Sequence, residues 1–435
     1  MASPLDGIRV VDFTEYIAGP YATMMLADMG ADVVKIERPT GDTWRHTAPV
    51  AEYESRGYLG VNRSKRSVAL DLTKTQGKEI AQRLALEADV VVANYRPGVA
   101  ERLGLDYKTL SGRNPALIYC ENSTYGSKGP YSGRAGFDIL SQAATGMILY
   151  ENKIERGVPQ FIATAAIADL TTGMFMAYAI VNALYARTSS GKGQLIETSL
   201  FASGLAAQYR PLLSVDELDK GVRDGFLSAL EDARRDGISF EDALKLKSEY
   251  IPGRGRNNYY RVYETKDGLI AVACLNNRLR RNLRDALGVD DASVDGMGYD
   301  WFSEEVRVAH RKAVEHYETG FRERTTDELL TLLDAADVPC SRVNFPEEMY
   351  ENEHVRANDL MVDLEHPVVG NLRMPASPVR MSNTPTSKPT PPPVLGADGP
   401  AVLRELGMSD DEIERLLDEG VLVTRERLLA TDEHG

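Results

Sequence analysis

Along the first 200 residues, short apolar runs typical of strands alternate with stretches in which apolar residues recur at helical spacing. Short apolar runs of strand length, at 8–13 and 32–37, flank a stretch near 21–29 whose apolar residues recur at helical spacing. Gly30 follows that stretch, where a glycine C-cap belongs. Further strand-like runs lie at 67–72, 89–93 and 116–120, with helical patterns near 75–88 and 99–113. This alternation predicts an α/β fold with a parallel, doubly wound, Rossmann-like sheet and right-handed crossovers.

The pattern changes in the second half of the chain. Two longer helical patterns at about 137–150 and 169–187 precede a strand-like run at 195–199. A β-hairpin is predicted from two apolar runs that flank the turn Lys266-Asp-Gly268. Its strands and the following helices are expected at 259–264, 269–274, 276–287, 303–323 and 326–336. These elements predict a second, smaller lobe of the α+β class.

A chain of 435 residues exceeds the usual size of one hydrophobic core, so two lobes are expected. The stretch Pro385 to Pro393 is predicted to be an extended strap, and a helical tail around 399–419 is expected to dock by its apolar face. The predicted organisation is a large domain at 1–215, a polar helical linker or elaboration at 216–256, a small domain at 257–340, and a C-terminal segment at 341–435 that returns to the large domain.

Composition narrows the function classes. A net charge of −15 and a pI near 5.0 argue against a nucleic-acid or membrane-surface partner. The three cysteines are dispersed and odd in number, so they form no metal-ligand spacing and favour a reducing compartment. The start of the chain carries no export signal, and the polar residues within the apolar stretch 161–186 favour a packed helix over a membrane span. We therefore expect a cytoplasmic protein.

Asp169 is the most informative single residue. It is the lone charge between Arg156 and Arg187, within an otherwise uncharged run that continues into a helical pattern. A carboxylate in apolar surroundings is costly to bury unless it is hydrogen-bonded, protonated or chemically active. An aspartate before a helix is also typical of an N-cap. The two interpretations are compatible, because a cap would keep a nucleophilic carboxylate ionised in a dry pocket.

A set of local sequences, rather than any one motif, carries a resemblance to a known family. The segments at 4–13, 26–39 and 62–72 belong to this set, and so do Ala18-Gly-Pro20 and Asn94-Tyr-Arg-Pro-Gly-Val-Ala-Glu-Arg-Leu-Gly-Leu105. Further members are Ala135-Gly-Phe-Asp138, Gly191-Lys-Gly-Gln194 and Val338-Pro-Cys-Ser-Arg-Val-Asn344. Together they resemble the class III CoA-transferases, which include the formyl-CoA and carnitine CoA-transferases. The resemblance spans nearly the whole chain and is weakest at 205–256.

The resemblance implies roles for particular residues. In the family, an aspartate that enters a helix and is followed by a glycine four residues later is the nucleophile, and Asp169 with Gly173 matches this pattern. The implied reaction moves CoA from an acyl-CoA donor to a free carboxylic acid through an aspartyl anhydride and an aspartyl-CoA thioester, with no metal or redox cofactor. The backbone amides of Ala18 and Gly19 are the candidates for stabilising the oxyanion. The implied CoA contacts are Tyr16, Arg38, Leu70, Asn94, Tyr95, Arg102 and Leu103.

Some features of the site and assembly remain open at this point. Ile17 stands where formyl-CoA transferases carry a glutamine, so a small polar acyl group is disfavoured and the acid is not specified. The resemblance also implies an interlocked homodimer whose active site lies near a glycine segment, here Pro252-Gly-Arg-Gly255. The basic cluster Arg63, Lys65 and Arg66 is either a solvated loop or an aid in attracting the nucleotide.

Three alternatives compete with CoA transfer. An α-methylacyl-CoA racemase would carry a histidine immediately before the aspartate that corresponds to Asp138, whereas this chain has Phe137. A Rossmann dehydrogenase would show Gly-x-Gly-x-x-Gly after the first strand, where Ile17-Ala-Gly-Pro-Tyr21 stands instead. A catalytically silent subunit of a paired enzyme is the third alternative, and the retained Asp169 argues against it.

Overall fold

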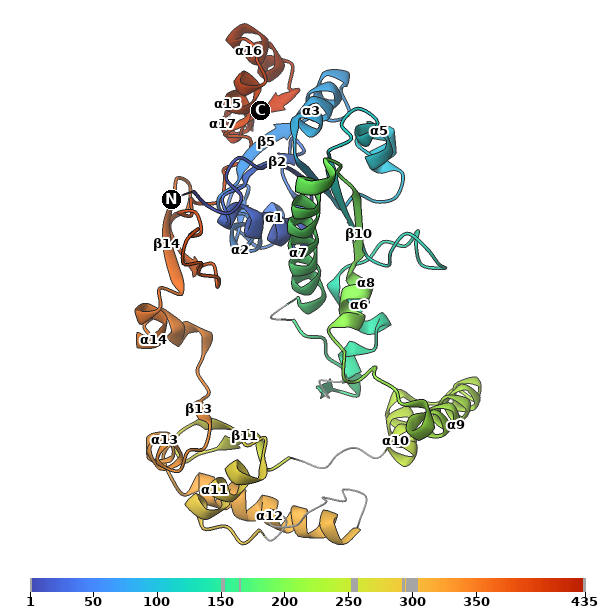
Figure 1. The fold of residues 1–435 in the computed structure, drawn as a ribbon, viewed down its shortest axis with the longest axis vertical. Helices are drawn as coiled ribbons and strands as arrows, with labels where there is room; N and C mark the ends of the chain where they lie inside the picture. The colour runs from blue at the N-terminus through green and yellow to red at the C-terminus, as the bar shows by residue number, and fades with distance from the viewer. Residues whose placement is uncertain are drawn as a thin grey trace. The chain divides into compact units, whose positions relative to one another are not determined.

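The computed structural model describes residues 2–149, 153–163, 166–251, 257–291, 294 and 304–432. The chain divides into two compact units. The first comprises residues 1–213 and 358–435, and the second comprises residues 214–357. Figure 1 shows the helices and strands of both units.

A seven-stranded sheet forms the centre of the first unit, with the order β10-β7-β6-β1-β2-β5-β16. Its strands are β1 (Arg9–Phe13), β2 (Asp32–Glu37), β5 (Arg66–Leu70), β6 (Val90–Ala93), β7 (Ile118–Ser123), β10 (Leu195–Ser199) and β16 (Leu422–Val423). The first six strands pair in parallel, which confirms the predicted parallel sheet. Their spatial order is that of the Rossmann fold, in which the chain reverses its direction of winding between β1 and β6.

Helices cover both faces of this sheet because neighbouring strand residues point to opposite sides. Val10 packs in a core with α1 (Ala18–Asp28) and α7 (Ile167–Ser190), whereas Val11 packs in a core with α3 (Thr75–Glu87) and the C-terminal helices. The C-terminal helices are α15 (Gly399–Glu405) and α16 (Asp410–Asp418). Figure 1 shows α7 running alongside the sheet, close to α1. The sheet is therefore doubly wound.

Shorter elements complete the first unit. They are η1 (Thr43–His46), β3 (Pro49–Ala51), β4 (Glu54–Ser55), α2 (Arg56–Gly60), α4 (Val99–Leu103), α5 (Tyr107–Ser111), α6 (Asp138–Ala144), η2 (Met147–Leu149), β8 (Ile154–Glu155), β9 (Val158–Pro159), α8 (Leu200–Ala206), β14 (Met361–His366), β15 (Gly370–Pro375) and α17 (Arg425–Asp432). The single helix predicted near 99–113 is two short helices, because Gly104 adopts a left-handed conformation after the first of them.

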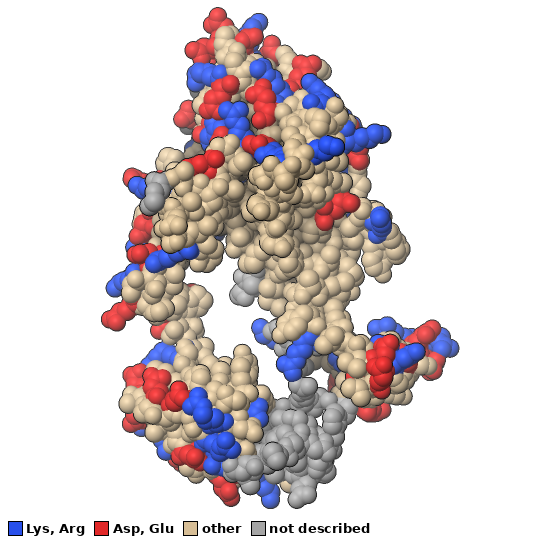
Figure 2. All heavy atoms as spheres, in the orientation of Figure 1, with Lys and Arg blue, Asp and Glu red and all other residues tan. Residues whose placement is uncertain are grey.

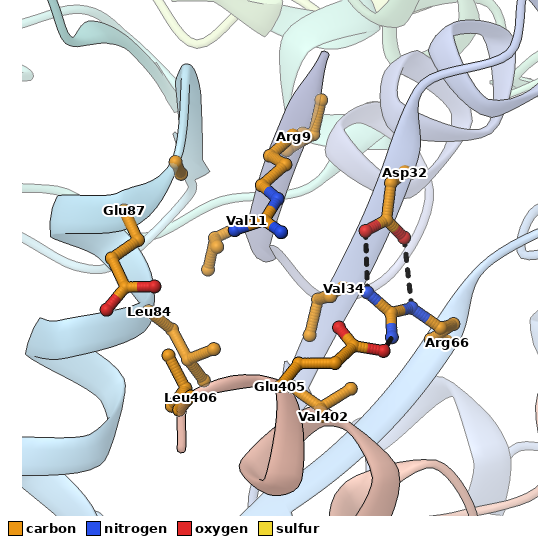
Figure 3. A pocket seen from close by; sticks show the side chains of 12 residues that line it. Arg9, Val11, Asp32, Val34, Arg66, Leu84, Glu87, Val402, Glu405 and Leu406 are labelled. Atoms are coloured by element: carbon orange, nitrogen blue, oxygen red, sulfur yellow. Dashed lines mark hydrogen bonds and ion pairs between the residues drawn. The ribbon is translucent and has the colours of Figure 1, made fainter. Parts of the chain in front are cut away.

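The C-terminal segment packs on the sheet that the N-terminal half builds. Its strand β16 pairs antiparallel with β5, an edge strand that the sequence pattern did not predict. Arg66 binds Asp32 at 2.6 Å and Glu405 of α15 at 2.7 Å, and Figure 3 shows the guanidinium between the two carboxylates. The basic cluster is therefore structural and not a nucleotide attractant, since Arg63 binds Asp28 and Lys65 binds Asp12 in the interior.

The second unit carries the predicted hairpin. Strands β11 (Tyr260–Glu264) and β12 (Leu269–Ala273) pair antiparallel, and β13 (Cys340–Arg342) pairs with β12. The helices are α9 (Asp216–Arg235), α10 (Phe240–Tyr250), α11 (Asn277–Leu287), α12 (Glu304–Arg322), α13 (Thr326–Ala335) and α14 (Glu353–Ala357), with η4 at Pro346–Tyr350. Tyr263 stacks on Phe321 with ring centroids 4.1 Å apart, in a core built from the hairpin and the helices that cover it.

Candidate active site

A cavity of about 570 Å³ opens in the first unit at the point where the sheet reverses its winding. Loops that follow β1, β6 and β7 line it, and in open α/β sheets this crevice is the usual ligand site. Its volume is in the range of small-molecule sites, about 300–1,000 Å³. Six of the predicted site residues line this cavity: Tyr16, Ala18, Arg38, Asn94, Tyr95 and Asp169. Four do not: Gly19, Leu70, Arg102 and Leu103.

Asp169 lies in the first turn of α7 but does not cap it. The helix begins at Ile167, and Ala166 occupies the N-cap position with a φ of 38°. The Asp169 carboxylate accepts no hydrogen bond from the described residues. Burial, and after it the negative charge of Asp138, raises the pKa of Asp169 to about 7. The interpretation that a cap geometry keeps this carboxylate ionised is therefore wrong, because Ala166 is the N-cap residue and the Asp169 carboxylate accepts no backbone N–H of the helix.

Asp138 supplies the cap that Asp169 does not. Its Oδ1 accepts hydrogen bonds from the backbone N–H of Ala168 at 2.7 Å and of Asp169 at 3.2 Å. Its Oδ2 accepts from Gln142 Nε2 at 2.5 Å, and Gln142 Oε1 in turn accepts from the N–H of Ile162 at 2.9 Å. Hydrogen bonds from Asp138 thus connect the first residue of α6 to the first turn of α7. These bonds fix the backbone that carries Asp169.

Close packing of two helices brings α7 to the first turn of α1. A Cβ at Gly173 would lie 2.7 Å from the carbonyl oxygen of Ala18, so only glycine permits this approach. The N–H groups of Ala18 and Gly19 have no acceptor among the described residues, as expected in the first turn of a helix. Ala18 faces the same cavity as Asp169, and its amide is therefore available to an oxyanion there.

The loop between β1 and α1 is held by side chains from neighbouring strands. Thr14 donates its N–H to Asp12 at 2.9 Å and accepts from Lys35 Nζ at 2.6 Å. The Asn94 amide donates to the Glu15 carbonyl at 2.8 Å and accepts from the Glu15 N–H at 3.0 Å. Tyr16, whose φ is +70°, donates its N–H to Asp42 at 3.3 Å. Both polar groups of the Asn94 amide therefore position the loop.

The other candidate CoA contacts fall into two groups. Arg38 and Tyr95 line the cavity, although Arg38 is already paired with Glu15 at 2.5 Å. Arg102 is exposed on α4, and Leu103 packs against the core beside it. Leu70 is fully buried and its β-strand pairs with Leu422, so its side chain belongs to the core.

Several cavity residues were not predicted from the sequence. Arg96 follows β6, and Arg134 and Phe137 lie in the segment that leads into α6. The Arg134 guanidinium lies 4.4 Å from the centroid of the Tyr131 ring. Ser123 is the last residue of β7 and Thr124 follows it, at the same edge of the sheet. The available signal was their position directly after parallel strands, where ligand-binding side chains gather.

Three further observations bear on the site. The glycine segment 252–255, predicted to lie near it, is outside the described residues. Within the described ranges, no group of three or more His, Cys, Asp or Glu residues is arranged to hold a metal ion. One described helix, α7, is long and apolar enough to cross a membrane by length and composition alone, a test that the core helices of soluble proteins also pass.

The Rossmann-order sheet, and a cavity lined by a half-buried carboxylate and by the first turn of a helix, are the features of an α/β fold with a site suited to acyl chemistry. The sequence model of CoA-transferase family III matches residues 5–228 and 238–399. The chain belongs to this family, and it is a family III CoA-transferase. Enzymes of the family use CoA thioesters as substrates, and the dehydrogenase alternative is thereby excluded.

Similarity to known CoA-transferases and to a solved structure supports the assignment of this chain to the family. The succinyl-CoA:glutarate CoA-transferase of Mus musculus is 32% identical over 427 residues, which cover 97% of this chain and 91% of that protein. The β subunit of succinyl-CoA–L-malate CoA-transferase of Chloroflexus aurantiacus is 30% identical, with coverages of 96% and 98%. The crystal structure of a CAIB/BAIF family protein from Brucella suis superposes with a TM-score of 0.71, at 28% identity and coverages of 93% and 100%.

Proposed function

We propose that this chain transfers CoA from an acyl-CoA to a free carboxylic acid with Asp169 as the nucleophile. The observation that supports this most directly is the placement of Asp169. Its carboxylate has no hydrogen-bond partner among the described residues, and it faces the same cavity as the unoccupied amide of Ala18. A carboxylate without donors is little stabilised in its ionised form and is therefore the more nucleophilic.

The reaction proceeds in four attacks. The Asp169 carboxylate attacks the thioester carbonyl and expels the CoA thiolate, which leaves a mixed anhydride. The thiolate attacks the Asp169 carbonyl, releases the first acid as a carboxylate and forms an aspartyl-CoA thioester. The acceptor carboxylate then attacks this thioester, expels the thiolate and forms a second mixed anhydride with Asp169. The thiolate attacks the acceptor carbonyl of this anhydride, which gives the new acyl-CoA and releases the Asp169 carboxylate. The free N–H of Ala18 stabilises the negative charge on oxygen in the tetrahedral states.

A dicarboxylic acid is the acceptor class that we propose. The relatives from mouse and Chloroflexus are named for succinyl-CoA with glutarate and with malate. The cavity is lined by two arginines, Arg96 and Arg134, that form no ion pair with the described residues. A guanidinium suits the second carboxylate of such an acid.

We further propose that two chains assemble into a homodimer through α7. The outward residues Met174, Tyr178, Val181 and Tyr185 recur at helical spacing and are 48%, 68%, 43% and 78% exposed. Figure 2 shows an uncharged surface over this helix, in contrast to the mixed charges elsewhere in that view. An apolar stripe of this kind is typical of a protein interface.

Asp169→Asn and Asp169→Ala test the proposed chemistry. Both variants are expected to lose transfer by at least about a thousandfold, because the anhydride cannot form. The wild-type enzyme is incubated with succinyl-CoA and a panel of monocarboxylic and dicarboxylic acids, and hydroxylamine trapping should mark the peptide that contains Asp169. Full transfer by Asp169→Ala would refute the proposal. Exchange of the α-proton of a 2-methylacyl-CoA in deuterated water, without CoA transfer, would instead support the racemase.

A further inference from the structure

Two aromatic rings meet at the cavity that contains Asp169. The rings of Tyr16 and Phe137 pack edge to face with centroids 5.2 Å apart and planes at 76°. Trp44 extends the group, with its ring 5.9 Å from that of Tyr16. Tyr16 and Phe137 line the cavity, and Phe137 is 51% exposed in this unliganded chain. A large aromatic side chain exposed inside a cavity indicates a surface that a ligand covers.

The two rings come from two separate loops, each of which is connected through the backbone to the start of α7 that carries Asp169. Phe137 directly precedes Asp138, whose carboxylate binds the backbone N–H of Asp169 at 3.2 Å. Tyr16 lies two residues before Ala18, whose carbonyl borders α7 at Gly173, one helical turn after Asp169. The aromatic pair is thus connected to both ends of the acyl site by short, fixed stretches of backbone.

Both stretches are held in place by contacts with neighbouring segments of the chain. Tyr16 keeps an energetically costly left-handed backbone, with its N–H donated to Asp42. Gly136, next to Phe137, packs so tightly that a Cβ there would lie 2.5 Å from the Thr124 side chain. Thr124 Oγ1 also donates to the Gly136 carbonyl at 3.0 Å. The rings are therefore positioned before substrate binds.

We propose that Tyr16 and Phe137 form an aromatic wall that shields the intermediates on Asp169 from water and so sets the ratio of CoA transfer to hydrolysis. This inference rests on the proposed function. In the competing reaction, water attacks the acyl carbonyl of the anhydride and breaks its bond to the Asp169 oxygen. The acid and the Asp169 carboxylate are released, and the CoA thiolate takes up a proton. The net result is hydrolysis of the acyl-CoA. Phe137 has no polar atom that orients or activates a water.

Phe137→Ala tests the wall. Succinyl-CoA is supplied with and without glutarate, free thiol is followed with a thiol reagent, and the new acyl-CoA is measured by chromatography. We expect the ratio of hydrolysis to transfer to rise roughly tenfold or more, because water then reaches the anhydride. Phe137→Tyr and Phe137→Leu refill the space and are expected to restore a ratio close to that of the wild type. The acid limb of the pH–rate profile should move to lower pH in Phe137→Ala, since water then solvates the Asp169 carboxylate.

Leu140→Ala is the matched control. Leu140 lies on α6, which begins directly after Phe137; it is 43% exposed and does not line the cavity, so this variant should keep the wild-type ratio. An unchanged ratio in Phe137→Ala, or an equal rise in Leu140→Ala, would overturn the wall. If Phe137→Ala has no measurable turnover, Phe137→Val takes its place as the smaller side chain, and an unchanged ratio of hydrolysis to transfer in Phe137→Val would overturn the wall. Loss of transfer in Asp169→Ala alongside an unchanged ratio in Phe137→Ala would refute the wall alone, whereas transfer by Asp169→Ala refutes the proposed function.

Discussion

At the scale of single residues, Asp169 has an unusual environment in the cavity, because burial and the charge of Asp138 raise its pKa. The sequence identified this residue, because a lone charge in an apolar run is visible without a structure. The environment of Asp169 could not be predicted from the sequence, because Asp138 provides both the helix cap and the neighbouring negative charge and lies 31 residues earlier in the chain. The sequence therefore singled out a carboxylate that does line the cavity, but with the wrong account of the cap; its catalytic role stays a prediction.

Asp169→Asn should change stability in a pH-dependent way. The folded-state pKa of about 7 lies above the ordinary value of 3.8, so the folded chain binds more protons than the unfolded chain between these values. The wild type therefore loses stability as pH rises from about 4 to 7, and the variant does not have this loss. We expect the Tm of Asp169→Asn to exceed that of the wild type at pH 8 by more than at pH 5. The measurement is thermal unfolding at both pH values.

The same protonation should appear in catalysis. The nucleophile must be ionised, so wild-type kcat/KM for the acyl-CoA should rise with pH and level off above about 7. A Tm difference that does not vary with pH, combined with a flat pH–rate profile, would contradict the raised pKa of Asp169.

At the scale of elements, the approach of α7 to α1 brings Gly173 against the carbonyl of Ala18, and Ala18 and Asp169 line the same cavity. The helical pattern predicted α7 near its observed bounds, because its apolar positions recur at helical spacing over many residues. The close contact at Gly173 was not derivable from that periodicity, since a glycine within a helix only signals that some packing partner exists. The short strand β16 was not predicted for a related reason. It has only two residues, which are too few to show the alternation of apolar and polar positions that indicates a strand.

Gly173→Ala should separate these helices. The added Cβ would meet the Ala18 backbone at 2.7 Å, and a backbone carbonyl cannot move aside as a flexible side chain does. We expect a loss of about 2 kcal/mol in the free energy of unfolding from overpacking, together with reduced kcat. Chemical denaturation and steady-state kinetics measure both.

Gly221→Ala is the matched control for this substitution. Gly221 lies within α9, and a Cβ there would meet nothing within 4 Å. This variant should gain up to about 1 kcal/mol from helix propensity and keep its activity. Equal effects of the two substitutions would show that the contact with Ala18 is not the cause.

At the scale of the whole molecule, the first unit is assembled from both ends of the chain. The alternation of strand-like and helical apolar spacing predicted the parallel sheet, and the prolines of the stretch Pro385 to Pro393 predicted the extended strap. The docking of that strap depends on contacts between residues more than 300 positions apart, such as Ser67 with the N–H of Gly396 and Arg45 with the carbonyl of Pro393. Pairings at this separation leave no local pattern in a single sequence.

The apolar stripe on α7 predicts an interface between two copies of the chain. Tyr178→Asp combined with Tyr185→Asp places two charges on a surface whose burial between two chains would otherwise be favourable, at roughly 25 cal/mol per Å² of apolar area. Both side chains are exposed in the single chain, so the fold should persist and circular dichroism should be unchanged. Light scattering coupled to gel filtration should show a dimer for the wild type and a monomer for the double variant. Val50→Asp, at a position 46% exposed outside the stripe, should remain a dimer. A monomeric wild type, or dissociation caused equally by Val50→Asp, would contradict an interface at α7.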